Sequence, residues 1–137
     1  MTFYIDTSTL VVESHTDRAL GWLGAQQPGS VFISDWVHTE VASALSVKQR
    51  TAQLYPGLRA AAAAAWTRLH TSSLPTLAAT PDHFHTAADF AGRPHLSLRA
   101  GDALHLAIAS MGGHALVTLD NRMAEAAPQL GIGVEAI

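Results

Sequence analysis

Acidic side chains that follow short apolar runs are the feature of this sequence most able to do chemistry. Asp6 comes directly after the apolar residues 3–5, and Asp120 comes directly after an apolar run that ends at Leu119. If both runs are strands of one parallel sheet, their carboxyl ends lie at the edge where such sheets bind ligands. An aspartate after a strand is also a common turn or helix-capping residue, so position alone leaves both interpretations open.

Two further carboxylates fall where charge is uncommon. At ~100° per residue, a helix beginning at Trp36 places Glu40 inside its apolar stripe, between Trp36 and Val37. Asp102 stands in the first turn of a helix that is apolar on nearly all sides, where the helix dipole stabilises an anion. A buried carboxylate needs a cation or hydrogen-bond donors. Solvent exposure, an arginine partner, or the dipole alone are the structural alternatives for these two residues.

Together the four carboxylates predict a cation site. They are Asp6, Glu40, Asp102 and Asp120, and no lysine lies beside any of them in the sequence. Because carboxylates gathered in one pocket repel each other, a divalent cation is the natural compensation. Oxygen ligands suit Mg²⁺, with Mn²⁺ as a substitute. Such a site activates water and screens a phosphodiester during in-line displacement, so we expect all four residues to be catalytic and to bind the metal.

Short strand-like runs alternate with longer helical ones along the chain. Strands are expected at 3–5, 31–33, 115–119 and 133–137, and helices at 17–27, 36–50, 52–70, 81–92, 100–111 and from 121 to 129. Hairpin turn dipeptides are missing between the strands, which predicts an α/β fold around a mainly parallel sheet. No repeat or linker divides the sequence, so residues 1–137 are expected to form a single domain.

Composition excludes several classes of protein. The 137 residues include 48% hydrophobic and 14% charged residues, which is typical of a globular chain. The sequence has no cysteine, so it has no disulfide scaffold, cysteine nucleophile or cysteine-bound zinc. No signal peptide is expected, because residues 1–6 lack a basic start and an apolar core. No membrane span is expected either, because the longest uncharged run, 103–119, contains two histidines and a glycine pair. The expectation is a cytoplasmic protein without membrane contact.

Four segments of the chain stand out in order: YIDTSTL at 4–10, TEVASAL at 39–45, LRAGDALHLA at 98–107 and VTLD at 117–120. With this order and spacing, the chain resembles the PIN-domain ribonucleases, in particular VapC-type toxins of toxin–antitoxin pairs. The resemblance implies a three-layer α/β/α PIN-like domain and Mg²⁺-dependent hydrolysis of RNA to 5′-phosphate and 3′-hydroxyl ends. It assigns the family's acidic quartet to the four carboxylates named above, and supporting hydroxyl positions to Ser8 and Thr118.

The same resemblance implies partners: an RNA substrate, a cognate antitoxin that covers the site, and a second copy of the chain in a homodimer. Arg99 and Arg122 flank two of the carboxylates and are either phosphate contacts or surface charges. His105 lies three residues after Asp102 and shares its neighbourhood, so it is either a hydrogen-bond donor to the side chains of the site or, as we expect, a core histidine satisfied by a backbone group.

Other functions are open or excluded. A catalytically silent PIN-fold module that binds RNA or protein remains an alternative, as does another metal-dependent phosphodiesterase or a DNA nuclease. A haloacid-dehalogenase-type phosphatase needs a second aspartate where Ser8 stands. A response-regulator receiver needs a lysine after a late strand, and the only lysine is Lys48, in a helix. Dinucleotide binding lacks the glycine-rich G-x-G-x-x-G turn.

Overall fold

The computed structural model describes residues 1–11 and 16–137 as short strands alternating with helices. The strands are β1 (Phe3–Ile5), β2 (Val31–Ser34), β3 (Thr76–Leu77), β4 (Ala115–Val117) and β5 (Val134–Glu135). The helices are α1 (Thr7–Val11), α2 (Thr16–Gly24), α3 (Asp35–Arg50), α4 (Pro56–Ser73), α5 (Pro81–Ala91), the 3₁₀ helix η2 (Pro94–Leu96), α6 (Ala100–Gly112) and α7 (Asn121–Gln129).

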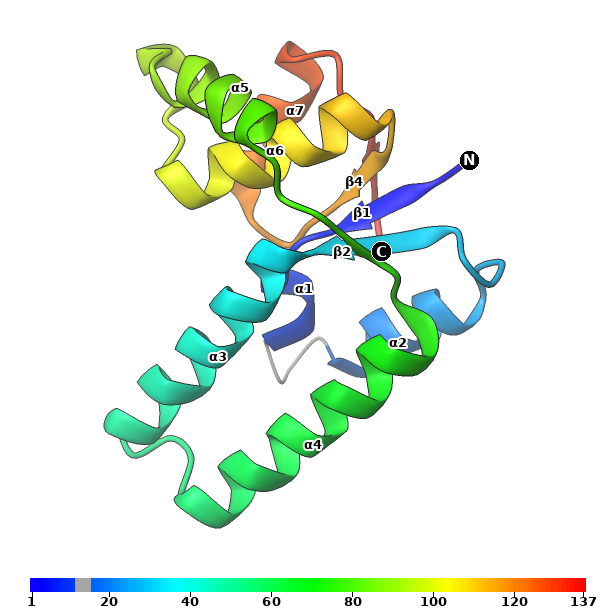
Figure 1. The fold of residues 1–137 in the computed structure, drawn as a ribbon, viewed down its shortest axis with the longest axis vertical. Coiled ribbons are helices and arrows are strands. Elements are labelled where there is room, and N and C mark those ends of the chain that lie inside the picture. Colours follow the sequence, from blue (N-terminus) through cyan, green and yellow to red (C-terminus); the bar gives the residue numbers. More distant parts are fainter. Residues whose placement is uncertain (12–15) are drawn as a thin grey trace.

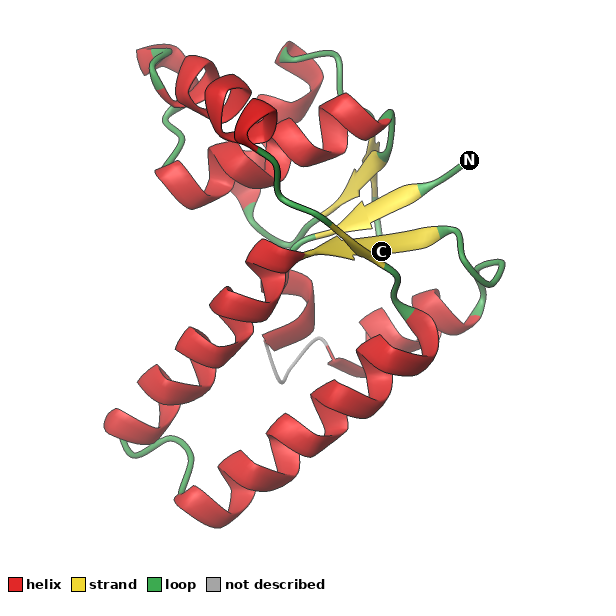
Figure 2. Ribbon diagram, viewed as in Figure 1, coloured by secondary structure: helices red, strands yellow, loops and turns green. Residues whose placement is uncertain are grey.

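The five strands form one sheet in the order β3-β2-β1-β4-β5, and every pairing is parallel. Helices α5, α6 and α7 lie on one side of the sheet, and α1, α2, α3 and α4 lie on the other (Figures 1 and 2). The expected three-layer α/β/α arrangement around a parallel sheet is therefore confirmed. Because helices cover both faces, the central strands are apolar throughout rather than alternating.

The core is centred on β1, β4 and α6. Tyr4, Leu106 and Leu116 are completely buried, and Ile5 and Ile108 are almost so. Helix α6 contributes a continuous buried run from Ala103 to Ala109. This agrees with its nearly all-round apolar sequence, which predicted a central helix.

Several boundaries differ from those expected. The strand predicted at 115–119 ends at Val117, and the one predicted at 133–137 has two residues, 134 and 135. Helix α4 begins at Pro56, because proline at the first helical position needs no amide partner. Helix α3 begins one residue early, at Asp35. The pattern missed β3, η2 and α1, whose Thr-Ser-Thr start has low helix propensity.

Helices α3 and α4 form a long hairpin that extends away from the sheet (Figure 1). No residue of α4 is fully buried, and Val47, Tyr55 and Leu58 are large apolar side chains exposed on the hairpin. The hairpin carries four basic residues and, from residue 41 to 73, no acidic one. Within the described ranges, no helix is both long enough and apolar enough to cross a membrane.

Truncation of the buried Leu106 tests the central position of α6. Leu106→Ala is expected to lower the free energy of unfolding by about 2–5 kcal/mol, because it removes buried methyl groups and leaves a cavity. The matched control is Leu58→Ala, since Leu58 is 45% exposed on α4 and its truncation should change stability by less than about 0.5 kcal/mol. Urea denaturation of both variants measures the difference. Equal losses would contradict the assignment of α6 to the core.

Candidate functional site

The carboxyl ends of β1 and β4 create the crevice in which the site is built. β2 lies on one side of β1 and β4 on the other, so successive connections turn to opposite sides here, which is where parallel sheets bind ligands. The pairing of Ile5 with Val117 brings the next residues, Asp6 and Thr118, side by side. Two segments more than a hundred residues apart in the sequence therefore meet at one point.

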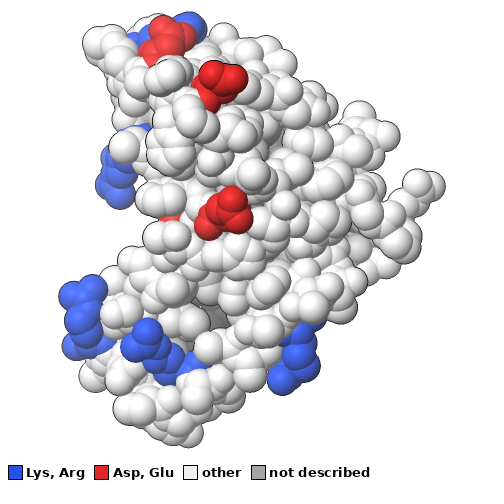
Figure 3. Space-filling view, viewed as in Figure 1, with Lys and Arg blue, Asp and Glu red and all other residues white. Residues whose placement is uncertain are grey.

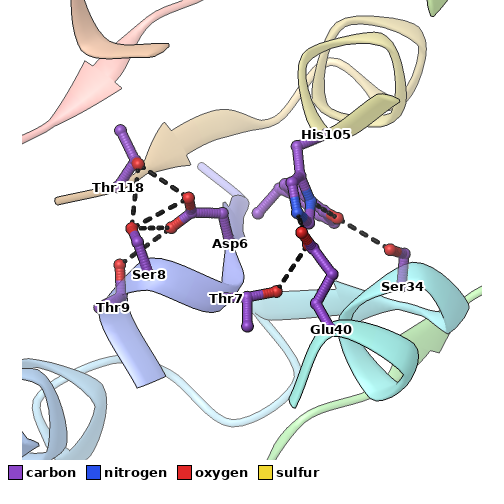
Figure 4. A network of polar contacts seen from close by, with 9 residues as sticks. Asp6, Thr7, Ser8, Thr9, Ser34, Glu40, His105 and Thr118 are labelled. Carbon is purple, nitrogen blue, oxygen red and sulfur yellow. Dashed lines mark hydrogen bonds and ion pairs between the residues drawn. The ribbon is translucent and has the colours of Figure 1, made fainter. Parts of the chain in front are cut away.

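Asp6 is buried among hydroxyl groups, three of which come from α1 and the end of β4 (Figure 4). Thr118 donates to Oδ2 at 2.9 Å, Ser8 to Oδ1 at 2.8 Å, and Thr9 to Oδ1 at 3.2 Å. Burial raises the pKa of the Asp6 carboxyl, although the hydroxyl donors act in the opposite direction. The supporting hydroxyls expected at Ser8 and Thr118 thus both contact Asp6. Thr9 was not anticipated.

Glu40 is held by two donors and is 32% exposed. Thr7 donates to Oε1 at 2.9 Å, and the same oxygen bonds to Nε2 of His105. Burial acts to raise the pKa of the Glu40 carboxyl. However, the hydrogen bonds from His105 and Thr7 outweigh burial and place this pKa below its usual value. The partner that makes an acidic residue tolerable in the apolar stripe is therefore a histidine.

The expectation for His105 was wrong about its partners. Its ring is buried, but its two nitrogens meet side chains rather than backbone groups: Nε2 contacts Glu40, and Nδ1 bonds to the Tyr4 hydroxyl at 2.7 Å. The sequence indicated that His105 shares the neighbourhood of Asp102 on α6. It did not indicate Tyr4, which is fully buried in β1.

Asp102 and Asp120 stand at the first turns of two helices. Asp102 Oδ2 accepts from the backbone N–H of Arg99 at 3.2 Å, and burial, then the charge of Asp120, raises its pKa. Asp120 lies three residues beyond β4 rather than directly after a strand. Its Oδ1 caps α7, accepting from the N–H groups of Arg122 at 2.9 Å and Met123 at 3.2 Å. The capping role considered for this residue is thus present.

Both aspartates line one open cavity. It has a volume of about 360 Å³, and the exposed Arg99 and Arg122 line it together with Asp102 and Asp120. An anionic ligand that reaches these carboxylates would therefore meet two arginines. Figure 3 shows further basic side chains over the lower part of the molecule, where α3 and α4 lie, without acidic ones among them on that face.

The predicted metal ligands form no ready-made cage. Among the residues that the structure describes, no group of three or more His, Asp or Glu side chains is arranged to hold an ion. The donor chemistry nevertheless fits Mg²⁺ or Mn²⁺, which bind carboxylate oxygens and retain several waters. The hydrogen bonds described for Glu40, Asp102 and Asp120 each fall on one oxygen, which leaves the other for a cation. A cation would also relieve the repulsion that raises the pKa of Asp102.

Comparison with known proteins places this geometry in a family. The chain matches the PIN domain family over residues 3–128. No curated protein sequence matches it.

Solved structures share the fold at low sequence identity. A toxin–antitoxin complex from Klebsiella pneumoniae matches at 21% identity and a TM-score of 0.60, covering 87% of each chain. VapC20 of Mycobacterium tuberculosis, a sarcin–ricin loop cleaving toxin, matches at 20% identity and a TM-score of 0.68, covering 91% of this chain and 95% of that one. VapBC2 of Rickettsia felis, bound to a promoter DNA fragment, matches at 13% identity and a TM-score of 0.67, covering 98% of both. With the family match spanning most of its length, this chain belongs to the PIN-domain family.

Proposed function

We propose that this protein is a Mg²⁺-dependent endoribonuclease and the toxin of a toxin–antitoxin pair. The observation that carries the proposal is the placement of Asp102 and Asp120 with two arginines around one cavity. Asp6, which directly follows β1 and accepts a hydrogen bond from Thr118 at the end of β4, would supply a third carboxylate. Membership of the PIN-domain family and the likeness to solved toxins support the assignment.

The surroundings of each residue suggest a different role in phosphodiester hydrolysis. When bound, a divalent ion would activate water and offset the negative charge of the phosphate. Asp6, Asp102 and Asp120 would hold it, and the hydroxyls of Ser8 and Thr118 keep the Asp6 carboxylate in place. We assign the role of proton acceptor to Glu40, because its lowered pKa leaves the carboxylate ionised at neutral pH and therefore able to take up a proton. It would orient the attacking water and take its proton, while the leaving 3′-oxygen takes up a proton from solvent.

An antitoxin and a second copy of the chain belong to the same proposal. A solved structure that shares this fold is a toxin–antitoxin complex. The exposed apolar side chains Val47, Tyr55 and Leu58 on the α3–α4 hairpin are suited to a protein partner. Its unbalanced basic residues favour an acidic partner segment or the RNA backbone.

Incubation of RNA with the protein and Mg²⁺ tests the activity. Cleavage is expected to leave 5′-phosphate and 3′-hydroxyl ends and to stop in EDTA, because the carboxylates need a cation to act. Asp102→Asn should lower the rate by more than about 100-fold, beyond the usual loss for an outer partner of a metal site. Glu125→Gln, an exposed acid on α7, is the matched control and should cleave like wild type.

Parallel reactions separate the alternatives. Cleavage of single-stranded DNA but not RNA would identify a DNA nuclease instead. RNA binding without cleavage would identify a silent module. Cleavage that persists in EDTA, or 2′,3′-cyclic phosphate ends, would contradict the metal mechanism.

Melting experiments test the cost of holding ionised carboxylates in this site independently of activity. Burial raises the pKa of Asp6 in the folded state, so the native protein prefers the protonated acid and loses stability as pH rises from the ordinary aspartate pKa towards the raised one. Asp6→Asn and Asp102→Asn are therefore expected to melt above wild type at pH 7 without metal. Saturating Mn²⁺ should raise the wild-type melting temperature, by ~2.7 kcal/mol of stability at a hundredfold excess over Kd, and act less on the variants. Lower melting of both variants and no response of wild type to Mn²⁺ would make the carboxylates structural.

Salt-dependent binding tests the two arginines. Arg99→Gln and Arg122→Gln should each weaken binding of single-stranded RNA in EDTA, because each removes a positive charge from the rim of the cavity. The slope of log K against log salt should become shallower by about 0.7 for each phosphate that the variant no longer neutralises. Arg93→Gln is the control, because Arg93 pairs with Asp89 at 2.7 Å, on α5 and the turn after it. An unchanged slope in the first two variants would show that these arginines do not bind RNA.

A further inference from the structure

A buried chain of hydrogen bonds runs from Glu40 into the core and involves four elements (Figure 4). Glu40 of α3 bonds to His105 of α6, and His105 Nδ1 lies 2.7 Å from the hydroxyl of Tyr4 in β1. That hydroxyl lies 2.8 Å from Oγ of Ser34, the last residue of β2. Tyr4 and Ser34 are fully buried, and His105 is 2% exposed. Of these four side chains, Glu40 alone is open to solvent.

The donors and acceptors in this series of hydrogen bonds favour one arrangement of the hydrogen atoms. If Ser34 donates to Tyr4 and Tyr4 donates to Nδ1 of His105, the proton of the neutral imidazole is on Nε2 and points at Glu40. Every buried hydroxyl hydrogen is then used. In the reverse arrangement, Nδ1 donates to Tyr4 and Tyr4 donates to Ser34. The Ser34 hydrogen then has no acceptor among the described residues, which buried polar groups rarely tolerate.

Ser34 bonds to Tyr4 instead of capping helix α3. It is the N-cap residue of α3, where a serine hydroxyl normally accepts a hydrogen bond from the first turn of the helix. Here its side chain makes no capping bond and is directed to Tyr4 instead. The Ser34 hydroxyl therefore takes part in the hydrogen bonds that lead to Glu40 and does not cap the helix. Departures of this kind from local preferences are common at functional sites.

We propose that His105 is a positioning residue for Glu40, held by Tyr4 and Ser34 with its Nε2 proton directed at the carboxylate. The inference rests on the proposed function, because it concerns the water-orienting role given to Glu40. His105 fixes which oxygen of Glu40 is engaged, Oε1, and leaves Oε2 for the attacking water or a cation. Thr7 donates to the same Oε1, so both donors constrain the carboxylate from one side.

Nuclear magnetic resonance of ¹⁵N-histidine-labelled protein tests the tautomer without any activity. The ring nitrogens of His105 are expected to show a proton on Nε2 in the wild type. Tyr4→Phe, which keeps the aromatic ring in the core, removes the donor to Nδ1 and should shift His105 toward a mixture of tautomers. A wild-type proton on Nδ1, or an unchanged signal in Tyr4→Phe, would overturn the proposal.

Cleavage kinetics test the consequence for Glu40. His105→Leu is expected to lower kcat by about tenfold or more with little change in KM, because the donor acts on the water-orienting group rather than on substrate binding. His105→Gln retains an amide donor and should recover most of the loss. If Gln is as slow as Leu, or if Leu is as fast as wild type, the proposal is wrong.

Two controls separate a positioning role from damage to the fold and from failure of the proposed function. His114→Leu removes a partly buried histidine and should leave kcat unchanged. His114 bonds to Thr2, and these two residues immediately precede β4 and β1, at the ends of the strands away from the site. If His105→Leu does not fold, Tyr4→Phe supplies the kinetic comparison, with a smaller expected fall in kcat. If the wild type cleaves no RNA, the proposed function fails. The tautomer measurement still decides which atoms of Ser34, Tyr4 and His105 donate hydrogen bonds.

Discussion

The burial of the Asp6 carboxylate between the ends of β1 and β4 is the constraint on which the rest of the site depends. An ionised group removed from water is tolerated only with donors or a cation close to it. The register that pairs Ile5 with Val117 brings Thr118 to one carboxylate oxygen, and the hydroxyls of α1 reach the other. Helix α1, short and rich in threonine and serine, is thus explained by what its side chains bind rather than by helix propensity.

The pKa values of the site carboxylates are shifted in opposite directions, and in each case the direction follows from the groups around the carboxylate. Asp6 and Asp102 have raised pKa values because burial, and for Asp102 the charge of Asp120, dominates. Glu40 has a lowered pKa because a histidine and a threonine donate to it. In the proposed mechanism, Asp6 and Asp102 would be cation ligands and Glu40 the proton acceptor. The opposite pKa shifts are consistent with these different roles.

Sequence reasoning located the carboxylates because each depends on a local signal. Asp6 follows an apolar run, Asp102 begins a long apolar helix, and Glu40 interrupts an apolar stripe, so nearby residues suffice to identify them. The end of the strand before Asp120 was predicted at residue 119 rather than 117, because the apolar Leu119 extends the apparent strand. Asp120 therefore lies three positions beyond the end of β4. Which function these positions serve stayed a matter of family resemblance and of experiment.

The histidine that bonds to Glu40, and the groups behind it, were beyond local reasoning, because they are set by packing across the sheet. His105 and Tyr4 are separated by 101 positions, and each has the sequence environment of a core residue. Only the parallel arrangement of β1 beside β2, with α6 above them, brings their polar atoms together. A buried tyrosine, histidine and serine are each easily satisfied by backbone groups or water. That they satisfy one another instead, with the Ser34 hydroxyl withdrawn from the end of α3, indicates that the core is arranged around the orientation of Glu40.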